Sequence, residues 1–167
     1  MSESHEMGHV EPQAEHRWLR QLVGEWTYEM EMPPGEGHPE GKVTGTETVR
    51  ALGDLWVVLE GRGQMPGGDE AVMQMTLGYD PARKAVVGTW IASMMAYLWV
   101  YEGRLRADGR ALELESDGPD MKGEGRLVRY MDVVEMVSPD HRTLTGHVRG
   151  EDGSWQPITT THYHRKR

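Results

Sequence analysis

The sequence has no cysteine and no phenylalanine, and only two of its 167 residues are isoleucine. The absence of cysteine excludes disulfide bonds, thiol catalysis and iron–sulfur ligation. No stretch of 18 apolar residues occurs, and the start Met1–Glu6 lacks the basic residues and the apolar run of a signal peptide. We therefore expect a cytoplasmic protein with no membrane partner.

Basic residues are also scarce. The chain has 18 Lys and Arg against 27 Asp and Glu, which gives a formal net charge of -9 at pH 7. A surface of this sign repels the phosphate backbone of nucleic acids and anionic lipid head groups, so no nucleic-acid partner is expected. The length suits one domain and is short for two.

The usual core formers are few, because Leu, Ile and Val together account for 29 residues, a fraction close to that of disordered chains. Twelve Met, six Trp and six Tyr raise the number of large apolar or aromatic residues to 53. The core is therefore expected to consist of large, adaptable side chains, and composition alone does not indicate a reaction.

The order of patterns predicts one short helix followed by strands. Residues 1–11 are polar and patternless and are expected to be disordered, whereas Trp18, Leu19, Leu22 and Val23 form a helical stripe that ends before Gly24. Alternating residues and turn signals then recur about every ten residues. The predicted strands are 24–32, 42–52, 55–64, 71–79, 84–93, 97–107, 110–118, 124–137, 142–150 and 154–165.

Tight connections between these strands indicate consecutive antiparallel hairpins. About ten strands in a meander close most naturally into an up-and-down antiparallel β-barrel, because closure removes both exposed edges. The sequence thus predicts an all-β, closed antiparallel barrel with a short N-terminal helix, as one domain over residues 12–167. An open sandwich is the alternative.

Turn lengths predict which residues share a face. A two-residue loop at Asp108-Gly109 sets Leu105 opposite Leu112 and Gly103 opposite Leu114. The hairpin around Pro81 is expected to set Leu77 by Val86, Met75 by Gly88 and Met73 by Trp90. In the last hairpin one face is predicted to contain Leu144, Gly146, Val148, Trp155, Thr159 and Tyr163.

Two hairpins are predicted to place charges on apolar faces. A two-residue loop at Gly53-Asp54 sets Glu47 opposite Glu60, with Arg62 on the same face, and the turn at Pro139-Asp140 turns Arg129 and Glu135 inward. Buried charges need partners, which favours a partly polar cavity. The alternative is that these charges reach water near strand ends, or that a bulge turns one strand over.

The leading hypothesis is a barrel that binds a small, mostly apolar ligand. The residues predicted to line the site are Trp56, Glu60, Arg62, Met73, Met75, Trp90, Trp99, Tyr101, Arg129 and Glu135. An alternative is an enzyme in which the pair of Glu47 and Glu60 transfers a proton, since adjacent carboxylates do not both ionise easily. Exposed apolar strand faces would also serve a homodimer interface.

Histidines near the C-terminus give a third alternative. His162 and His164 point the same way on one strand, and His141 comes within reach across the hairpin. The neighbouring Arg165, Lys166 and Arg167 would repel a cation, so no metal site and no cofactor are expected. A haem barrel with His147, His162 or His164 as axial ligand is the remaining possibility, although these residues share a polar face.

Several segments carry a family resemblance. Leu22-Val23-Gly24-Glu25-Trp26 resembles the start of calycin barrels such as lipocalins. Together with Leu52–Gly61, Thr76–Pro81, Val87–Trp90 and Tyr163–Lys166, the chain resembles the bacterial domain-of-unknown-function family fifteen-seventy-nine, from about Trp18 to Lys166.

This resemblance implies a lipocalin-like barrel and no established activity. By analogy with calycins, Trp26 would close one barrel end, with Arg149 or Arg165 packed on it. Lipocalins proper are usually secreted and disulfide-bonded, and because this chain has neither mark, extracellular transport does not carry over.

Overall fold

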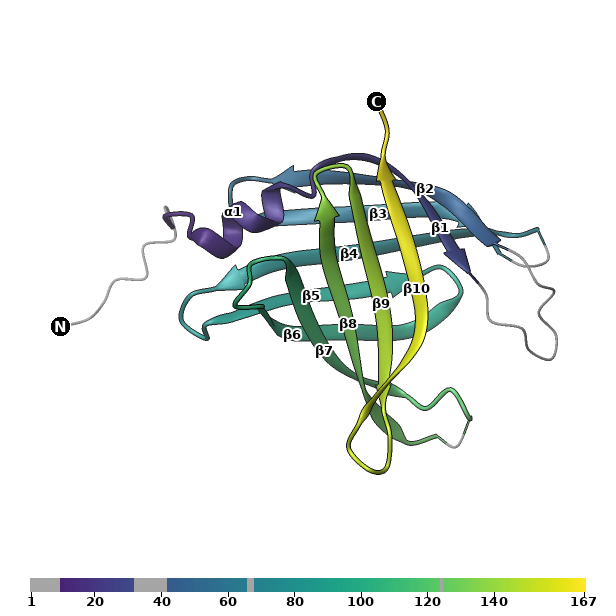
Figure 1. The fold of residues 1–167 in the computed structure, drawn as a ribbon. Coiled ribbons are helices and arrows are strands. Elements are labelled where there is room, and N and C mark those ends of the chain that lie inside the picture. Colours follow the sequence, from purple (N-terminus) through teal and green to yellow (C-terminus); the bar gives the residue numbers. More distant parts are fainter. Residues whose placement is uncertain (1–9, 32–41, 66–67, 124) are drawn as a thin grey trace.

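The computed structural model describes residues 10–31, 42–65, 68–123 and 125–167, and its ten strands form a closed antiparallel barrel in which neighbours in sequence are neighbours in space (Figure 1). The predicted fold is therefore confirmed. The elements are α1 Ala14–Arg20, β1 Gly24–Glu31, β2 Lys42–Leu52, β3 Trp56–Gln64, β4 Glu70–Asp80, β5 Ala85–Ala92, β6 Met95–Leu105, β7 Ala111–Pro119, β8 Leu127–Ser138, β9 His141–Arg149 and β10 Trp155–Arg165.

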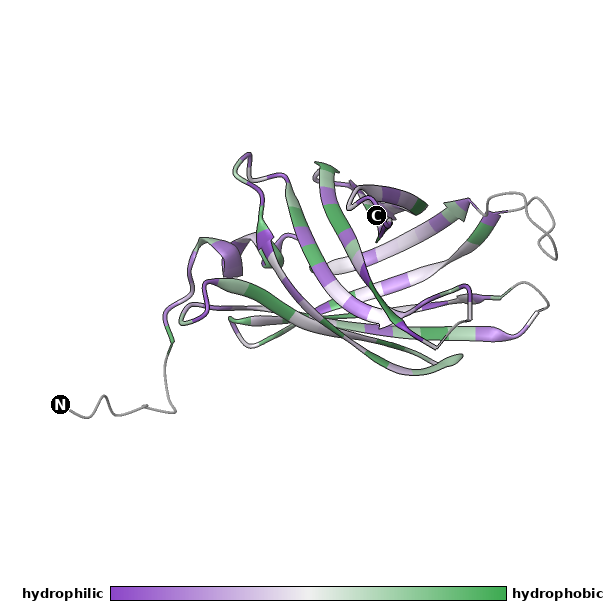
Figure 2. Cartoon of the chain, turned by 90° about the horizontal axis from the view of Figure 1, so that it is seen from below, coloured by the Kyte–Doolittle hydropathy of each residue, from purple (hydrophilic) through white to green (hydrophobic). Residues whose placement is uncertain are grey.

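The strands form because apolar and polar residues alternate, so one face of each strand is turned inward. Apolar and polar bands follow one another along the strands in Figure 2. The described residues contain no helix that is long and apolar enough to cross a membrane. The division into a tail over 1–11 and one domain over 12–167 stays a prediction, since residues 1–9 lie outside the described part.

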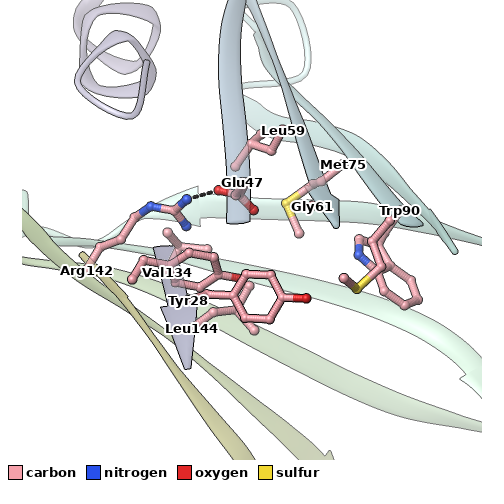
Figure 3. A pocket seen from close by; sticks show the side chains of 11 residues that line it. Tyr28, Glu47, Leu59, Gly61, Met75, Trp90, Val134, Arg142 and Leu144 are labelled. Atoms are coloured by element: carbon pink, nitrogen blue, oxygen red, sulfur yellow. Dashed lines mark hydrogen bonds and ion pairs between the residues drawn. The ribbon is translucent and has the colours of Figure 1, made fainter. Parts of the chain in front are cut away.

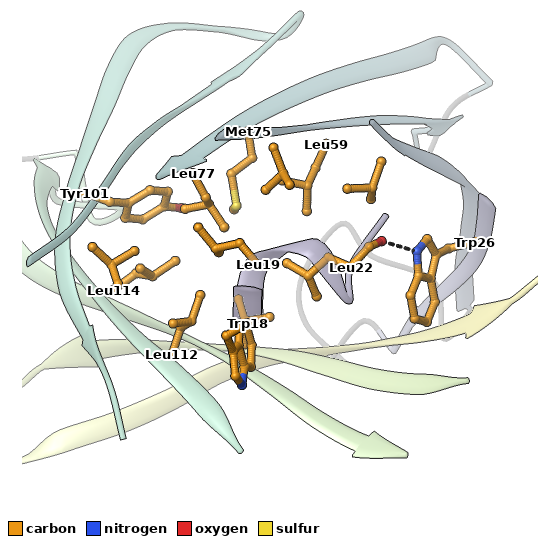
Figure 4. Close-up of a cluster of buried hydrophobic side chains, with 14 residues drawn as sticks. Trp18, Leu19, Leu22, Trp26, Leu59, Met75, Leu77, Tyr101, Leu112 and Leu114 are labelled. Atoms are coloured by element: carbon orange, nitrogen blue, oxygen red, sulfur yellow. Dashed lines mark hydrogen bonds between the residues drawn. The ribbon is translucent and has the colours of Figure 1, made fainter. Parts of the chain in front are cut away.

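Helix α1 closes one end of the barrel. Its Trp18 and Leu19, together with Leu22, point into the barrel end and pack on inner residues of the strands (Figure 4). Burying each such side chain contributes about 1.5–3 kcal/mol. Polar contacts fix the helix, because Trp18 Nε1 donates to the carbonyl of Gly109 at 2.7 Å and buried His16 bonds the carbonyl of Tyr79 at 3.0 Å.

Trp26 and Arg165 complete this end, as the calycin analogy predicts. Trp26 is fully buried, and the guanidinium carbon of Arg165 lies 4.2 Å from the centroid of its ring. Arg165 also donates to the carbonyls of Gln21 and Val23, at 2.8 and 2.7 Å, in the segment that follows α1. These contacts join β10 to β1 and to the segment that follows α1. The rest of the barrel interior lies beyond this packed end.

Several predicted registers are confirmed. Leu105 lies opposite Leu112 and Gly103 opposite Leu114. In the β4–β5 hairpin the partner of Leu77 is Gly88, two residues beyond the predicted Val86, so the pairs are wrong but every face is right. The inner face of the last hairpin is confirmed except for its ends, where a bulge between Pro157 and Thr159 turns Trp155 to the other face.

The predicted pair of Glu47 and Glu60 is wrong. Leu52 pairs with Trp56, so the β2–β3 loop has three residues, with Gly53 at a φ of 64°, instead of two. Glu47 therefore lies opposite Gly61, while Glu60 lies opposite Thr48 on the outer face. One residue of slip moves the whole set of β3 side chains to the other face, and Trp56 and Arg62 move outward with Glu60.

The predicted inward placement of Arg129 and Glu135 is also wrong. Ser138 pairs with His141 as expected, but a bulge between Met136 and Ser138 shifts the register of β8. Val134 then lies opposite Leu144 and is buried, and Glu135 lies opposite Thr143 on the outer face with Arg129. The extra residue in a β-bulge produces this reversal without any sign in the hydrophobic pattern.

Candidate functional site

A buried ion pair crosses the interior between two strands far apart in sequence. Arg142 on β9 donates through Nη2 to Oε1 of Glu47 on β2, and the side chains are only 1% and 10% exposed (Figure 3). The guanidinium carbon of Arg142 lies 3.8 Å from the ring centroid of Tyr163 and 4.7 Å from that of Trp26. Such a pair is stable in the interior only because each charge compensates the other.

Burial affects the charge state of Arg142. Removal of the guanidinium from water lowers the pKa of Arg142 to about 10, which is still far above neutral pH. Arg142 therefore keeps its positive charge, and Glu47 is the carboxylate that balances it. The enzyme hypothesis relied on adjacent side chains of Glu47 and Glu60, and the structure places these side chains on opposite faces of the wall.

The ion pair borders a cavity of about 50 Å³ inside the barrel. Met73, Met75 and Trp90, on β4 and β5, are apolar members of its lining. Figure 3 shows Met75 and Trp90 on the side of the cavity away from Arg142, with Glu47 between them and Arg142. The full lining consists of Tyr28, Glu47, Leu59, Gly61, Met73, Met75, Trp90, Val134, Arg142, Leu144 and Tyr163. The cavity thus joins a charged, aromatic side to a thioether and indole side.

Glycine at position 61 leaves room for this cavity. A Cβ atom at Gly61 would lie 3.3 Å from Cε of Met73, so any larger side chain would project into the space that the cavity occupies. The lining glycine is flanked on β3 by outward side chains, Glu60 and Arg62. A substitution at 61 therefore fills the interior, whereas one at 60 changes only the outer face.

One buried donor of the ion pair has no partner. Nε of Arg142 makes no hydrogen bond, although Nη2 of the same side chain bonds Glu47. A buried donor without an acceptor costs about 1–3 kcal/mol. Nε1 of Trp99, further along the interior, is likewise buried without a partner.

A second polar pair lies on the inner face, between β6 and β8. The hydroxyl of Tyr101 donates to Oδ2 of Asp132 at 2.5 Å. Burial raises the pKa of Asp132, although the hydrogen bond from Tyr101 opposes this change. Burial and the neighbouring carboxylate together raise the pKa of Tyr101 well above 10. Among the contacts of the described residues, no cationic side chain forms an ion pair with the buried carboxyl group of Asp132.

The structure places the ten predicted lining residues in three groups. Met73, Met75 and Trp90 line the cavity. Trp99 and Tyr101 face the interior outside this cavity. The remaining five residues lie on the outer face, namely Trp56, Glu60, Arg62, Arg129 and Glu135.

The outward residues have ordinary surface partners. Arg62 pairs with Glu70 at 2.8 Å, and Arg129 pairs with Glu115 at 3.3 Å and Asp117 at 3.1 Å. The indole of Trp56, 42% exposed, lies where a side chain at Gly78 would otherwise be. These contacts leave no interior role for this group.

The histidines named in the haem hypothesis lie on the outer face. His162 pairs with Thr143 and His164 pairs with His141, on the face opposite to that of Tyr163. His147 forms a hydrogen bond with the carbonyl of Met131 at 3.2 Å. His141 Nε2 lies 3.1 Å from His162 Nδ1. No three His, Asp or Glu side chains within the described ranges converge to hold a metal ion.

Sequence reasoning missed Arg142, Asp132, Tyr28 and Tyr163 as site residues. A signal existed for Arg142, because it has the same parity on its strand as Leu144, which the last hairpin places inside. Tyr28 alternates with Trp26 on β1 and was open to the same reasoning. Asp132 had no such signal, because the bulge at Val137 decides its face.

Comparison with known proteins shows the family. Residues 11–165 match the family described as "Protein of unknown function (DUF1579)", so the chain belongs to this family. A search of curated proteins found no match.

Among solved structures, the S-type phycobiliprotein lyase CPES from Guillardia theta is similar over 93% of this chain and 94% of that chain, with 10% identity and a TM-score of 0.60. A redesigned β-barrel covers 90% and 96%, with 11% identity and a TM-score of 0.47. A de novo fluorescence-activating β-barrel covers 89% and 96%, with 13% identity and a TM-score of 0.46. The likeness to the lyase concerns the fold alone.

Proposed function

We propose that this protein binds a small amphipathic molecule inside its barrel. The polar end of the ligand lies against Arg142 and Tyr163, and its apolar body lies against Met73, Met75 and Trp90. A cytoplasmic location, which the sequence predicts, remains part of this proposal, and exposed apolar strand faces leave a homodimer as an alternative role for those faces.

The observation that carries the proposal is an interior cavity lined on one side by the buried guanidinium of Arg142 and on the other by thioether and indole side chains. Arg142 is fixed by Glu47 and by the rings of Trp26 and Tyr163, so its guanidinium is held in place before any ligand arrives. A ligand with a carbonyl, hydroxyl or ether oxygen offers an acceptor to this group. A carboxylate is less suitable, because Glu47 already balances the charge of Arg142.

The size of the cavity limits the ligand. About 50 Å³ is room for a few water molecules, and sites for drug-sized ligands measure about 300–1,000 Å³. The ligand is therefore compact, or it displaces the side chains of Met73 and Met75. Thioether side chains are unbranched and re-orient at low cost, which suits the second case.

A cavity-filling variant tests the proposal. Gly61→Leu places its side chain in the cavity, whereas Glu60→Leu adds the same side chain to the outer face of the same strand. Native mass spectrometry of freshly purified protein is expected to show a retained small molecule in the wild type and in Glu60→Leu, and none in Gly61→Leu. Organic extraction followed by mass spectrometry identifies the molecule.

Two results would contradict the proposal. The first is wild-type protein that carries no added mass when it is purified without denaturation. The second is an added mass that persists in Gly61→Leu at the wild-type level, because the molecule would then lie elsewhere. Thermal unfolding of both variants shows whether loss of the ligand reflects loss of the fold.

A further inference from the structure

The barrel wall is incompletely paired at one place. Strands β6 and β7 are in register only from Glu102–Glu115 to Leu105–Leu112, although β6 begins at Met95 and β7 continues to Pro119. On their other sides both strands remain paired, β6 with β5 back to Met95 and β7 with β8 as far as Pro119. In Figure 1, β6 runs across the barrel, whereas β7 descends and turns away from β6.

A groove of about 330 Å³ occupies this divergence. Its outer rim holds charged residues of β6, β7 and β8, including Glu102, Asp117 and Arg129. Its inner side reaches Tyr97 and Tyr101, and Tyr101 is 4% exposed and bonded to Asp132 in the interior. The groove therefore lies on the outer surface of the wall, and its lining includes two residues of the inner face, Tyr97 and Tyr101.

Aromatic side chains fill the gap where backbone hydrogen bonds are missing. The hydroxyl of Tyr97 donates to the carbonyl of Asp117 at 2.7 Å, so a side chain replaces the ladder at this point. The ring of Trp99 occupies the space that any side chain at Gly118 would need, and it contacts Tyr97 and Tyr130 edge to face. Trp99 also pairs with Trp90, which lines the cavity.

This seal is weaker than a strand ladder. A side-chain rotation opens it, whereas a ladder opens only when several backbone hydrogen bonds break together. The buried Nε1 of Trp99 has no partner, so outward rotation of this ring loses no hydrogen bond.

We infer that the divergence of β6 and β7 is a lateral entrance to the barrel interior, gated by Tyr97 and Trp99. The inference rests on the proposed interior site and names the route by which its ligand enters and leaves. The side chains of Tyr97 and Trp99 close this entrance, and the proposal gives them no contact with the bound ligand.

The absence of cysteine allows a test that needs no known ligand. Met75→Cys places one thiol at the cavity wall, and the rate at which iodoacetamide alkylates it reports access to the interior. Trp99→Ala and Tyr97→Phe are each combined with Met75→Cys, and Trp155→Ala on the outer face is the matched control.

Trp99→Ala is expected to raise the alkylation rate by about ten-fold and Tyr97→Phe by about two-fold, while Trp155→Ala leaves it within about two-fold of the parent. Equal rates in all four proteins, or rates that follow the free energy of global unfolding, would overturn the inference. Alkylation is measured on protein refolded from urea, which removes any bound molecule, so the entrance can be contradicted while mass spectrometry of freshly purified protein still supports the binding site, and the reverse.

Discussion

At the scale of single residues, Arg142 connects the packed end of the barrel to the cavity. Its guanidinium contacts the ring of Trp26, which the helix end buries, and the ring of Tyr163, which lines the cavity. The same group bonds Glu47 and still has a donor to spare. One side chain thus contributes to folding and, in the proposed function, contacts the ligand.

The ion pair gives a prediction for stability. Arg142→Met leaves the carboxylate of Glu47 buried without a partner, and the free energy of unfolding is expected to fall by about 3–5 kcal/mol. The double variant Arg142→Met with Glu47→Leu removes both charges and is expected to recover most of this loss. Urea unfolding of wild type, both single variants and the double variant measures the coupling, and additive losses would contradict it.

Asp132 gives a prediction for pH dependence. Burial raises the pKa of its carboxyl above the ordinary 3.8, so the folded protein holds this proton more tightly than the unfolded chain does. Ionisation therefore destabilises the fold as the pH rises from 3.8 through the raised pKa, and each pH unit in this range costs about 1.4 kcal/mol. The amide in Asp132→Asn still accepts the bond from Tyr101 and does not ionise.

Relative to the wild type, Asp132→Asn is expected to gain stability as the pH rises across this range and to show no further change above it. Urea unfolding at a series of pH values measures the difference. Asp69→Asn, at an exposed position, is the control. Parallel curves for wild type and Asp132→Asn would show that the carboxyl keeps its ordinary pKa.

At the scale of elements, register decides which predictions succeed. The β4–β5 hairpin was predicted with a register error of two residues, and Met73, Met75 and Trp90 were still placed inside correctly. The β2–β3 hairpin was predicted with an error of one residue, which moved Glu60 to the wrong face. Alternation has a period of two, so even errors preserve faces and odd errors reverse them.

The bulge in β8 gives a prediction at this scale. Val137 is the inserted residue and is 56% exposed, so Val137→Thr is expected to change the free energy of unfolding by about 0.5 kcal/mol or less. Deletion of Val137 instead drives buried Val134 outward or breaks the pairing with β9. The deletion is expected to cost several kcal/mol or to abolish cooperative unfolding, as measured by tryptophan fluorescence in urea.

The comparison between these two variants isolates the bulge, because both change the same residue. If the deletion variant unfolds at the same urea concentration as Val137→Thr, the assignment of faces in β8 is wrong. Asp132 and Val134 would then not face the interior.

At the scale of the whole molecule, the sequence predicts the fold better than the site. Short strands joined by tight turns define a meander, and ten of them close into a barrel with the helix at one end. Three of the ten predicted lining residues line the cavity, because lining depends on loop length and on bulges. The opening between β6 and β7 leaves no trace in hydrophobic alternation, because Tyr97, Trp99 and Tyr101 alternate as in a fully paired strand.

Many of the large, adaptable side chains that the composition predicts for the core lie around the cavity. Leu19 and Leu22, with Trp18 and Trp26, pack the helix end, while methionine, tryptophan and tyrosine line the cavity together with Leu59, Val134 and Leu144. The packed end supplies stability, and the cavity is bordered by unbranched thioether side chains that can re-orient at low cost.

A crystal structure of protein purified without denaturation tests the central claim most directly. Binding in the interior predicts continuous electron density larger than water in the cavity, with an acceptor atom within hydrogen-bond distance of a guanidinium nitrogen of Arg142. Met73 and Met75 would be displaced from the positions described above if the molecule exceeds the cavity. Density for ordered water alone, with both methionines in place, would contradict the claim that this barrel is a binding protein.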